Sequence, residues 1–355
     1  MTPIVLFGGR SDERHVSVAS AQNIARNLDA PLCWFWAPNG TVYDVSTHEL
    51  LQHQNPFIDD YVPSRPAVWP DIEMALDTLP VEDPVFVLAL HGGEGEDGTL
   101  QRMMERRGIA FTGSDSEASA IAFDKERAKD CVRDRGVKVA ESRVVIPSVS
   151  EGSGGEGAAQ SPSVRLDPSL SLTVTAREML DRHDRIVAKP LGGGSSRGLF
   201  FLNRGDTIPN MEVPYIVEPF IAGRELTVGV FNGAALPVIE IEIDSTRQFD
   251  YEGKYLGKGA REICPAKISD AMRGEVQRIG LIAHEAIGCD GCSRTDVIAN
   301  DDGVWFLELN TLPGLTTSSL VPLALREAGI TMREFIEREI TSALRRRSRA
   351  HRASR

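Results

Sequence analysis

Two apolar runs separated by a short polar turn occupy residues 293–310, which read SRTDVIANDDGVWFLELN. The Asp-Asp-Gly sequence at 301–303 is a turn signal between apolar runs, which predicts an antiparallel hairpin. With the turn centred on its middle residue, Asp296 and Glu308 lie directly opposite each other, and Asn310 shares their face because strand side chains alternate with period two. Two carboxylates and an amide oxygen then converge on one face of the hairpin.

This arrangement favours a metal site. Like charges that face each other destabilise a sheet unless a cation lies between them, and oxygen ligands of this kind suit Mg²⁺ that also contacts phosphate. The alternative is a solvated hairpin whose charges point outward. The apolar neighbours Val297-Ile298 and Phe306-Leu307 count against that alternative, since they indicate a buried hairpin.

The chain around this hairpin has 355 residues, more than one ordinary hydrophobic core needs, so several domains are expected. Residues 1–115 alternate strand and helix patterns, which predicts an N-terminal parallel α/β, Rossmann-like lobe. Residues 116–220 predict a central α+β lobe, in which the Gly- and Ser-rich segment 148–171 is a flexible surface insertion. Residues 221–345 predict a C-terminal, mainly antiparallel lobe, and residues 346–355 a basic disordered tail.

Individual elements follow from the apolar spacing. Strands are expected at about 4–7, 85–90, 110–112, 186–189, 199–202, 215–218, 225–231, 236–243, 293–298 and 304–309, and helices at about 271–287, 319–328 and 332–345. Ser114 and Glu117 fit a capping box, so one helix is expected to run from there to a terminating glycine at Gly136.

Charge and hydropathy limit the partners. A formal net charge of −12 opposes nucleic acid binding as the main activity. The N-terminus has no basic region followed by a long apolar run, and no apolar stretch of about 18 residues occurs. We therefore expect a cytoplasmic protein with no membrane partner.

Two further segments are candidates for nucleotide binding. Residues 189–198 read KPLGGGSSRG between two apolar strands, where glycines let backbone N–H groups approach phosphates and Lys189 supplies a charge. This is not a P-loop, and a plain hairpin loop is the alternative reading. Glu218 ends one strand and Glu225 begins the next, so this crossover could contact adenine and ribose, although two solvent-facing glutamates fit the segment equally well.

Three ordered motifs carry a resemblance to a known family. They read FGGRSDERHVS at 7–17, LHGGEGEDGTLQ at 90–101 and ELNTLPGLTTSSL at 308–320. Over roughly residues 4–340 the chain resembles the ATP-grasp enzymes and, among them, the D-alanine–D-alanine ligases. The resemblance implies an ATP-grasp fold of three lobes with ATP between the central and C-terminal lobes.

The resemblance also implies the cofactor sites. The residues that match nucleotide-binding positions are Lys125, Lys189, Gly194, Ser196, Glu218 and Glu225. Asp296, Glu308 and Asn310 match the ligands of two Mg²⁺ ions, for which Mn²⁺ can substitute, in agreement with the hairpin argument. The expected partners are D-alanine and ATP, and the expected assembly is a homodimer.

The first substrate site is implied by the two N-terminal motifs. Glu13 would hold the ammonium group of the first D-alanine and form a hydrogen-bonded trio with Ser195 and Tyr255. His91 would lie near this substrate. Taken alone, His91 is as compatible with a structural histidine at the end of a buried strand.

The second substrate site and the oxyanion site are implied by the C-terminal motif and its surroundings. Lys254 and Ser319 would bind the carboxylate of the second D-alanine. Arg294 and the backbone N–H of Gly314 would stabilise the oxyanion. Residues 245–261 are the expected lid, because an acyl phosphate must be kept from water.

The expected reaction is ATP-dependent ligation of two D-alanine molecules through an acyl phosphate, for peptidoglycan precursor synthesis. Two alternatives remain: a related ligase that uses D-lactate, D-serine or another amino acid as second substrate, and a non-catalytic ATP-binding module. Lys254-Tyr255 favours an amine nucleophile, and the retained amino-acid-holding residues favour an enzyme.

Overall fold

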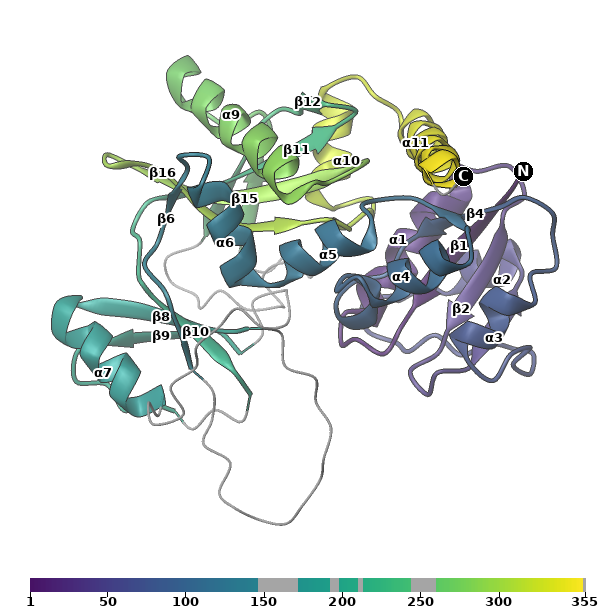
Figure 1. Ribbon diagram of the computed structural model, residues 1–355, viewed down its shortest axis with the longest axis horizontal. Coiled ribbons are helices and arrows are strands. Elements are labelled where there is room, and N and C mark those ends of the chain that lie inside the picture. Colours follow the sequence, from purple (N-terminus) through teal and green to yellow (C-terminus); the bar gives the residue numbers. More distant parts are fainter. Residues whose placement is uncertain (146–171, 192–197, 210–212, 244–259, 354–355) are drawn as a thin grey trace, which may run out of the picture. The chain divides into compact units, whose positions relative to one another are not determined.

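The computed structural model describes residues 1–145, 172–191, 198–209, 213–243 and 260–353 (Figure 1). The chain forms two compact units, of which the first combines Met1–Val139 with Gly223–Arg355 and the second is Ala140–Ala222. The predicted insertion at 148–171 and the predicted lid at 245–261 lie largely outside the described residues. No helix in the described part of the chain is long and apolar enough to cross a membrane.

The first sheet of unit 1 has five strands in the order β3-β2-β1-β4-β5. They are β1 (Thr2–Gly8), β2 (Leu32–Trp36), β3 (Val42–Val45), β4 (Pro84–Leu88) and β5 (Ala110–Phe111). All pairs are parallel except β2 with β3. The central strands are almost wholly apolar because both faces are buried, as parallel sheets require. The predicted N-terminal α/β lobe is thereby confirmed.

The helices of this region connect and cover the strands. They are α1 (Arg14–Arg26), α2 (Thr47–Gln52), α3 (Ile72–Asp77), α4 (Thr99–Arg106) and the 3₁₀ turn η1 (Gly93–Gly95). The chain leaves the carboxyl end of β1 at Gly8 and that of β4 just before His91. Since β1 and β4 are parallel neighbours, the first two sequence motifs meet at one edge of the sheet.

The second sheet of unit 1 has seven strands, and six of them follow the order β14-β13-β11-β15-β16-β6. They are β6 (Lys138–Val139), β11 (Arg224–Phe231), β13 (Ile239–Ile243), β14 (Ala260–Ile263), β15 (Ser293–Asn300) and β16 (Gly303–Asn310), while β12 (Ala234–Ala235) pairs with β11. The strands are antiparallel apart from β6 beside β16. Helix α9 (Asp270–Ile287) packs on this sheet (Figure 1).

The helix predicted from Ser114 to Gly136 is wrong as a single element. It is two helices, α5 (Ser116–Phe123) and α6 (Lys125–Arg133), because Asp124 ends the first and caps the second by accepting the N–H groups of Glu126 and Arg127. Asp115 caps α5 in place of the expected Ser114. Apolar side chains of both helices share a core with β15, β16 and α9, and both helices lie in unit 1.

Unit 2 is a small antiparallel sheet with one helix. Its strands run in the order β7-β10-β8-β9 and are β7 (Arg143–Val145), β8 (Arg185–Pro190), β9 (Phe200–Asn203) and β10 (Tyr215–Pro219). Helix α7 (Leu172–Arg182) packs on it through Ala176, Met179 and Leu180. The expected strands of this region are confirmed.

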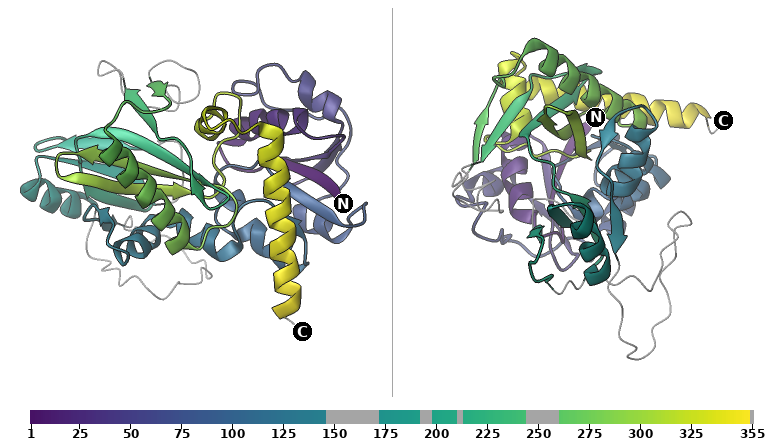
Figure 2. Two further views of the ribbon diagram at one scale, coloured as in Figure 1. Left: turned by 90° about the horizontal axis from the view of Figure 1, so that it is seen from above. Right: turned by 90° about the vertical axis from the view of Figure 1, so that its left-hand side faces the viewer.

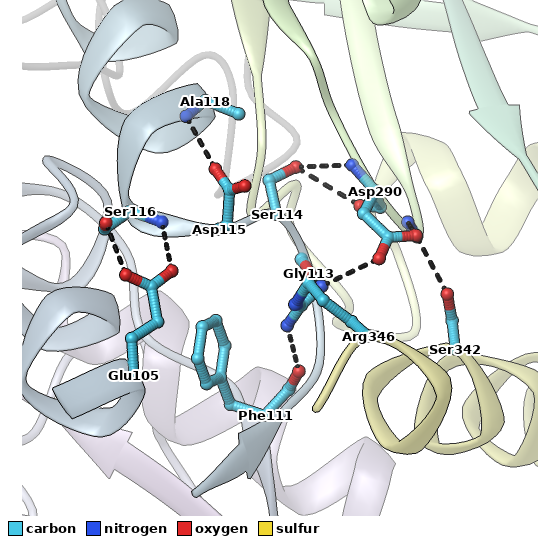
Figure 3. A network of polar contacts seen from close by, with 11 residues as sticks. Glu105, Phe111, Gly113, Ser114, Asp115, Ser116, Ala118, Asp290, Ser342 and Arg346 are labelled. Carbon is cyan, nitrogen blue, oxygen red and sulfur yellow. Dashed lines mark hydrogen bonds and ion pairs between the residues drawn. The ribbon is translucent and has the colours of Figure 1, made fainter. Parts of the chain in front are cut away.

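The disordered basic tail predicted from residue 346 is wrong as far as Ala353. After α10 (Leu320–Glu327), helix α11 runs from Met332 to Ala353 beside β4 and β5 (Figure 2). The Arg346 guanidinium donates to the carbonyl oxygens of Phe111 at 2.6 Å and Gly113 at 2.5 Å, and to Asp290 at 3.0 Å (Figure 3). This basic side chain therefore ties the last helix to the end of the first sheet.

Candidate active site

The hairpin β15–β16 brings the predicted metal ligands together. Asp296 pairs with Glu308, and Arg294 pairs with Asn310, so all four side chains share one face. The pairing near the turn follows a different register, in which Asn300 faces Gly303. A β-bulge next to Asp296 absorbs one residue of β16 between the two registers. Without it, Glu308 would point to the opposite face.

Asp296 is held by two neighbouring side chains. Arg294 donates to its two oxygens at 2.9 and 2.8 Å, and the Thr227 hydroxyl donates to Oδ1 at 2.5 Å. The Asp296 side chain is almost fully buried, so these charge-assisted bonds act where water does not compete. The carboxylate and the guanidinium are thereby fixed relative to each other.

The donor set fits a magnesium ion. The Asn310 side-chain amide nitrogen is buried and has no hydrogen-bond partner among the described residues. A rotation of this amide would present its oxygen instead, beside two carboxylates on the same face. Hard oxygen ligands of this number are those that Mg²⁺ takes together with phosphate oxygens. The described residues hold no group of three His, Cys, Asp or Glu suited to a metal.

A lysine lies on the same face of the hairpin. Lys125, the first residue of α6, places its ammonium nitrogen 3.6 Å from Oε2 of Glu308. Its side chain is 11% exposed and that of Glu308 is 29% exposed. A partly buried cation beside the predicted metal ligands suits an anionic group such as phosphate.

The other predicted nucleotide residues are divided between the units. In unit 2, Lys189 of β8 and the buried Glu218 of β10 form an ion pair of 2.8 Å. Glu225 is the second residue of β11 in unit 1 and lies opposite Ile298 of β15. The remaining predicted residues lie outside the described part of the chain, and they are Gly194, Ser195, Ser196, Lys254 and Tyr255.

Glu13 and a second carboxylate, Glu96, both lie close to Gly92. Glu96 belongs to the motif at 90–101 but was not among the predicted site residues. Glu13 is the N-cap residue of α1 and is 8% exposed. A Cβ atom added at Gly92 would lie only 2.8 Å from Oε2 of Glu13. Glu96 accepts the Gly92 N–H at 2.8 Å, and burial, with the nearby Glu13 charge, raises the pKa of Glu96 to about 8. Two acidic groups thus flank Gly92, which suits an ammonium group.

His91 has both ring nitrogens engaged by protein atoms. Nδ1 lies 3.2 Å from the carbonyl oxygen of Leu312, and Nε2 lies 3.1 Å from the Ser20 hydroxyl. A carbonyl oxygen can only accept, so Nδ1 carries the proton and Nε2 accepts from Ser20. Burial lowers the pKa of His91 to about 4, so the ring is neutral at neutral pH.

Ser319 and Gly314 lie close together where β16 leads into α10. Ser319 is the N-cap residue of α10, and its hydroxyl lies 2.7 Å from the Thr316 hydroxyl. A Cβ atom at Gly314 would approach the Ser319 oxygen to 2.8 Å, so only glycine fits there without displacement. The N-terminus of α10 suits the binding of a carboxylate.

The two sheets, the opposed carboxylates and the neighbouring lysine agree with the expected class, the ATP-dependent ligases with the ATP-grasp fold. Residues 2–114 match the family model for the D-Ala D-Ala ligase N-terminus, and residues 186–341 match that for the D-Ala D-Ala ligase C-terminus. The chain belongs to the D-alanine–D-alanine ligase family.

Individual relatives agree with this assignment. A D-alanine–D-alanine ligase from Chelativorans sp. (strain BNC1) is 34% identical, with 92% of each chain covered. Two solved structures share the fold. One is the Bacillus anthracis D-alanine–D-alanine ligase complexed with ATP, with a TM-score of 0.69, 24% identity and 98% of each chain covered. The other is the VanG D-Ala:D-Ser ligase from Enterococcus faecalis, with a TM-score of 0.73, 24% identity, and 96% of this chain and 99% of that chain covered.

Proposed function

We propose that this protein joins two D-alanine molecules into D-alanyl-D-alanine at the expense of ATP, as a cytoplasmic, homodimeric enzyme that supplies peptidoglycan precursors. Family membership supports the substrates. The observation that carries the chemistry is the pairing of Asp296 with Glu308, with Arg294 bound to the same carboxylate. These residues link a phosphate-binding face to a group that can stabilise a reacting carbonyl.

The first step activates the carboxylate of the first D-alanine. A carboxylate is a poor acyl donor, so its oxygen attacks the γ-phosphate of ATP, giving an acyl phosphate and ADP. Asp296, Glu308 and Asn310 would hold two Mg²⁺ ions, which when bound offset phosphate charge. Lys125 adds a positive charge on the same face, and Lys189 is a second candidate for the nucleotide phosphates.

The second step forms the peptide bond. The amine of the second D-alanine attacks the activated carbonyl, and phosphate leaves as the amine loses its proton. Arg294 and the Gly314 N–H are the proposed donors to the oxyanion, and Ser319 with Lys254 is proposed to bind the carboxylate of the attacking substrate. Arg294 suits this role because its bonds to Asp296 fix the guanidinium beside the phosphate site.

The remaining roles rest on the family resemblance. Glu13 is proposed to bind the first ammonium group, near His91, and Ser195 and Tyr255 to close the site above it. Gly194 and Ser196 are proposed to bind phosphate, Glu218 adenine and Glu225 ribose. We also propose the three-lobe division of the family for this chain.

The test is phosphate release and dipeptide formation with ATP, Mg²⁺ and D-alanine. D-serine and D-lactate are supplied in parallel as second substrates, because the VanG relative is named a D-Ala:D-Ser ligase. We expect D-alanyl-D-alanine as the main product, and Glu308→Gln should abolish it while leaving the fold intact. Turnover with D-serine or D-lactate but not with D-alanine alone would contradict the proposal.

A further inference from the structure

Helix α1 buries a row of polar side chains where a surface helix normally buries apolar ones. Ser17 and Ser20 are completely buried, and Asn23 is 8% exposed. The three residues recur at intervals of three, so they lie along one side of the helix. Burying a polar group lowers folding stability unless the group is hydrogen-bonded. The hydrogen-bond partners of these three residues therefore show which segments this side of the helix contacts.

Ser20 and Asn23 both hold the loop that carries Gly314. The Leu315 N–H donates to Oγ of Ser20 at 3.2 Å, and the Asn23 amide donates to the Leu315 carbonyl oxygen at 2.8 Å. Both backbone groups of Leu315, the residue after Gly314, are therefore bound by α1.

His91 extends this contact to the other side of the loop. Because Ser20 accepts from Leu315, its own proton points to Nε2 of His91, and Nδ1–H of the same ring donates to the Leu312 carbonyl oxygen. In this series of three hydrogen bonds each donor has one acceptor, so the direction of every bond is defined. The loop is thus held at residue 312 and at residue 315, on either side of Gly314.

The same helix carries the ammonium anchor. Glu13 is the N-cap residue of α1 and precedes Ser20 by seven residues, which corresponds to about 10 Å along a helix axis. A helix of this length is a stiff spacer. The distance between the Glu13 carboxylate and the Gly314 loop is therefore set by α1 and by the bonds at Ser20 and Asn23.

Packing around the loop is incomplete. A cavity of about 30 Å³, about the volume of one water molecule, borders Ser20, His91, Leu312 and Leu315. A shift of about 1 Å in a group that acts on the transition state can slow a reaction about 100-fold.

We propose that Ser20, Asn23 and His91 are positioning residues that fix the Gly314 N–H at a set distance from Glu13. The inference rests on the proposed function and deepens it. It assigns to α1 the alignment of the acyl phosphate, held at its ammonium end by Glu13, with the oxyanion donor at its carbonyl end.

The test compares three variants of adjacent α1 residues. Ser20→Ala removes both bonds of the hydroxyl, and Asn23→Leu removes the bond to Leu315. Gln22→Met is the matched control, because the Gln22 amide donates to the carbonyl oxygens of Leu50 at 2.9 Å and His53 at 2.6 Å, away from this loop. For each variant, the quantity measured is dipeptide formed per phosphate released, with KM for ATP and kcat. This ratio does not depend on the fraction of folded enzyme.

A misplaced oxyanion donor slows aminolysis and leaves the acyl phosphate to water. We expect kcat for dipeptide to fall at least about tenfold in Ser20→Ala and Asn23→Leu, with phosphate in excess of dipeptide and KM for ATP unchanged. Gln22→Met should keep a ratio of one. A ratio of one in both test variants, or an equal change in all three, overturns the inference. If Ser20→Ala does not fold, Asn23→Leu decides. If the wild type releases no phosphate with D-alanine, the proposed function fails first, and the inference falls with it.

Discussion

Replacement of Gly92 by alanine should weaken binding of the first D-alanine specifically. Gly92 has φ 67° and ψ 167°, a region that is essentially restricted to glycine. The added Cβ would lie 2.5 Å from the Ser11 hydroxyl oxygen and 2.8 Å from Oε2 of Glu13. Real Cβ contacts are longer than about 3.0 Å, so the Glu13 carboxylate must move.

The magnitude has two parts. Backbone strain costs about 1–3 kcal/mol of folding stability. Displacement of Glu13 weakens a hydrogen bond to a charged group, which is worth about 1.5–3 kcal/mol and corresponds to a rise of about 10- to 100-fold in KM for D-alanine. KM for ATP should change less, because the nearest atoms to the added Cβ belong to Ser11 and Glu13 and not to the hairpin of the proposed phosphate site.

Gly93→Ala is the control that separates backbone strain from displacement of Glu13. Gly93 also has a positive φ, 50°, but a Cβ atom there would meet nothing within 4 Å. Thermal unfolding reports the strain in each variant, and phosphate release against D-alanine concentration reports the binding. Equal KM values for D-alanine in the two variants would refute the placement of Glu13 beside Gly92.

Three further predictions concern single side chains. Thr227→Val removes the donor to Oδ1 of Asp296 and should raise the Mg²⁺ concentration needed for half-maximal turnover by about 10- to 100-fold. An unchanged Mg²⁺ dependence of turnover would contradict this prediction. Arg346→Ala should lower the free energy of unfolding, measured by denaturant titration, by about 2–3 kcal/mol, because the bonds to the Phe111 and Gly113 carbonyl oxygens are lost. Arg349 is exposed, so Arg349→Ala should leave the free energy of unfolding unchanged. Equal effects of the two substitutions would argue against a stabilising role for the Arg346 bonds. Burial raises the pKa of Glu339 from 4.5 to about 7, so the folded state keeps a proton that the unfolded state releases, and stability should fall as pH rises from 4.5 to 7. Glu339→Gln should flatten this fall, and an unchanged slope would show that Glu339 does not titrate in this range.

The hairpin shows what a sequence pattern can and cannot predict. The presence of Asp296 and Glu308 on two paired strands was predictable, because apolar runs and a turn signal define those strands. The predicted turn centre was wrong, since Asn300 faces Gly303. The β-bulge restores the pairing of Asp296 with Glu308 in spite of that error. The bulge itself could not be predicted from the local sequence, because a bulge depends on the twist of the whole sheet.

The incorrect elements depend on partners that are distant in the chain. The arginine-rich C-terminus reads as a solvated tail, but Arg346 finds carbonyl acceptors at Phe111 and Gly113, more than two hundred residues earlier. The division between α5 and α6 was readable in principle, since Asp124 is a good capping residue, but the apolar spacing continues through it.

Ser20 and Glu96 were overlooked for a related reason. A serine within an apolar helix pattern is neutral evidence until its partners are known, and those of Ser20 are His91 and Leu315. Glu96 lies inside a motif of several acidic residues, and only the fold shows which of them is buried beside Glu13.

The measurement that tests the central claim most directly is the joint count of ADP, phosphate and dipeptide made from D-alanine, ATP and Mg²⁺. An ATP-dependent ligase of the proposed kind yields the three products in equal amounts, and Glu308→Gln, which keeps the shape of the side chain but removes its charge, yields none of them. ATP binding without dipeptide from any D-amino acid tested, or full activity in Glu308→Gln, would contradict the account.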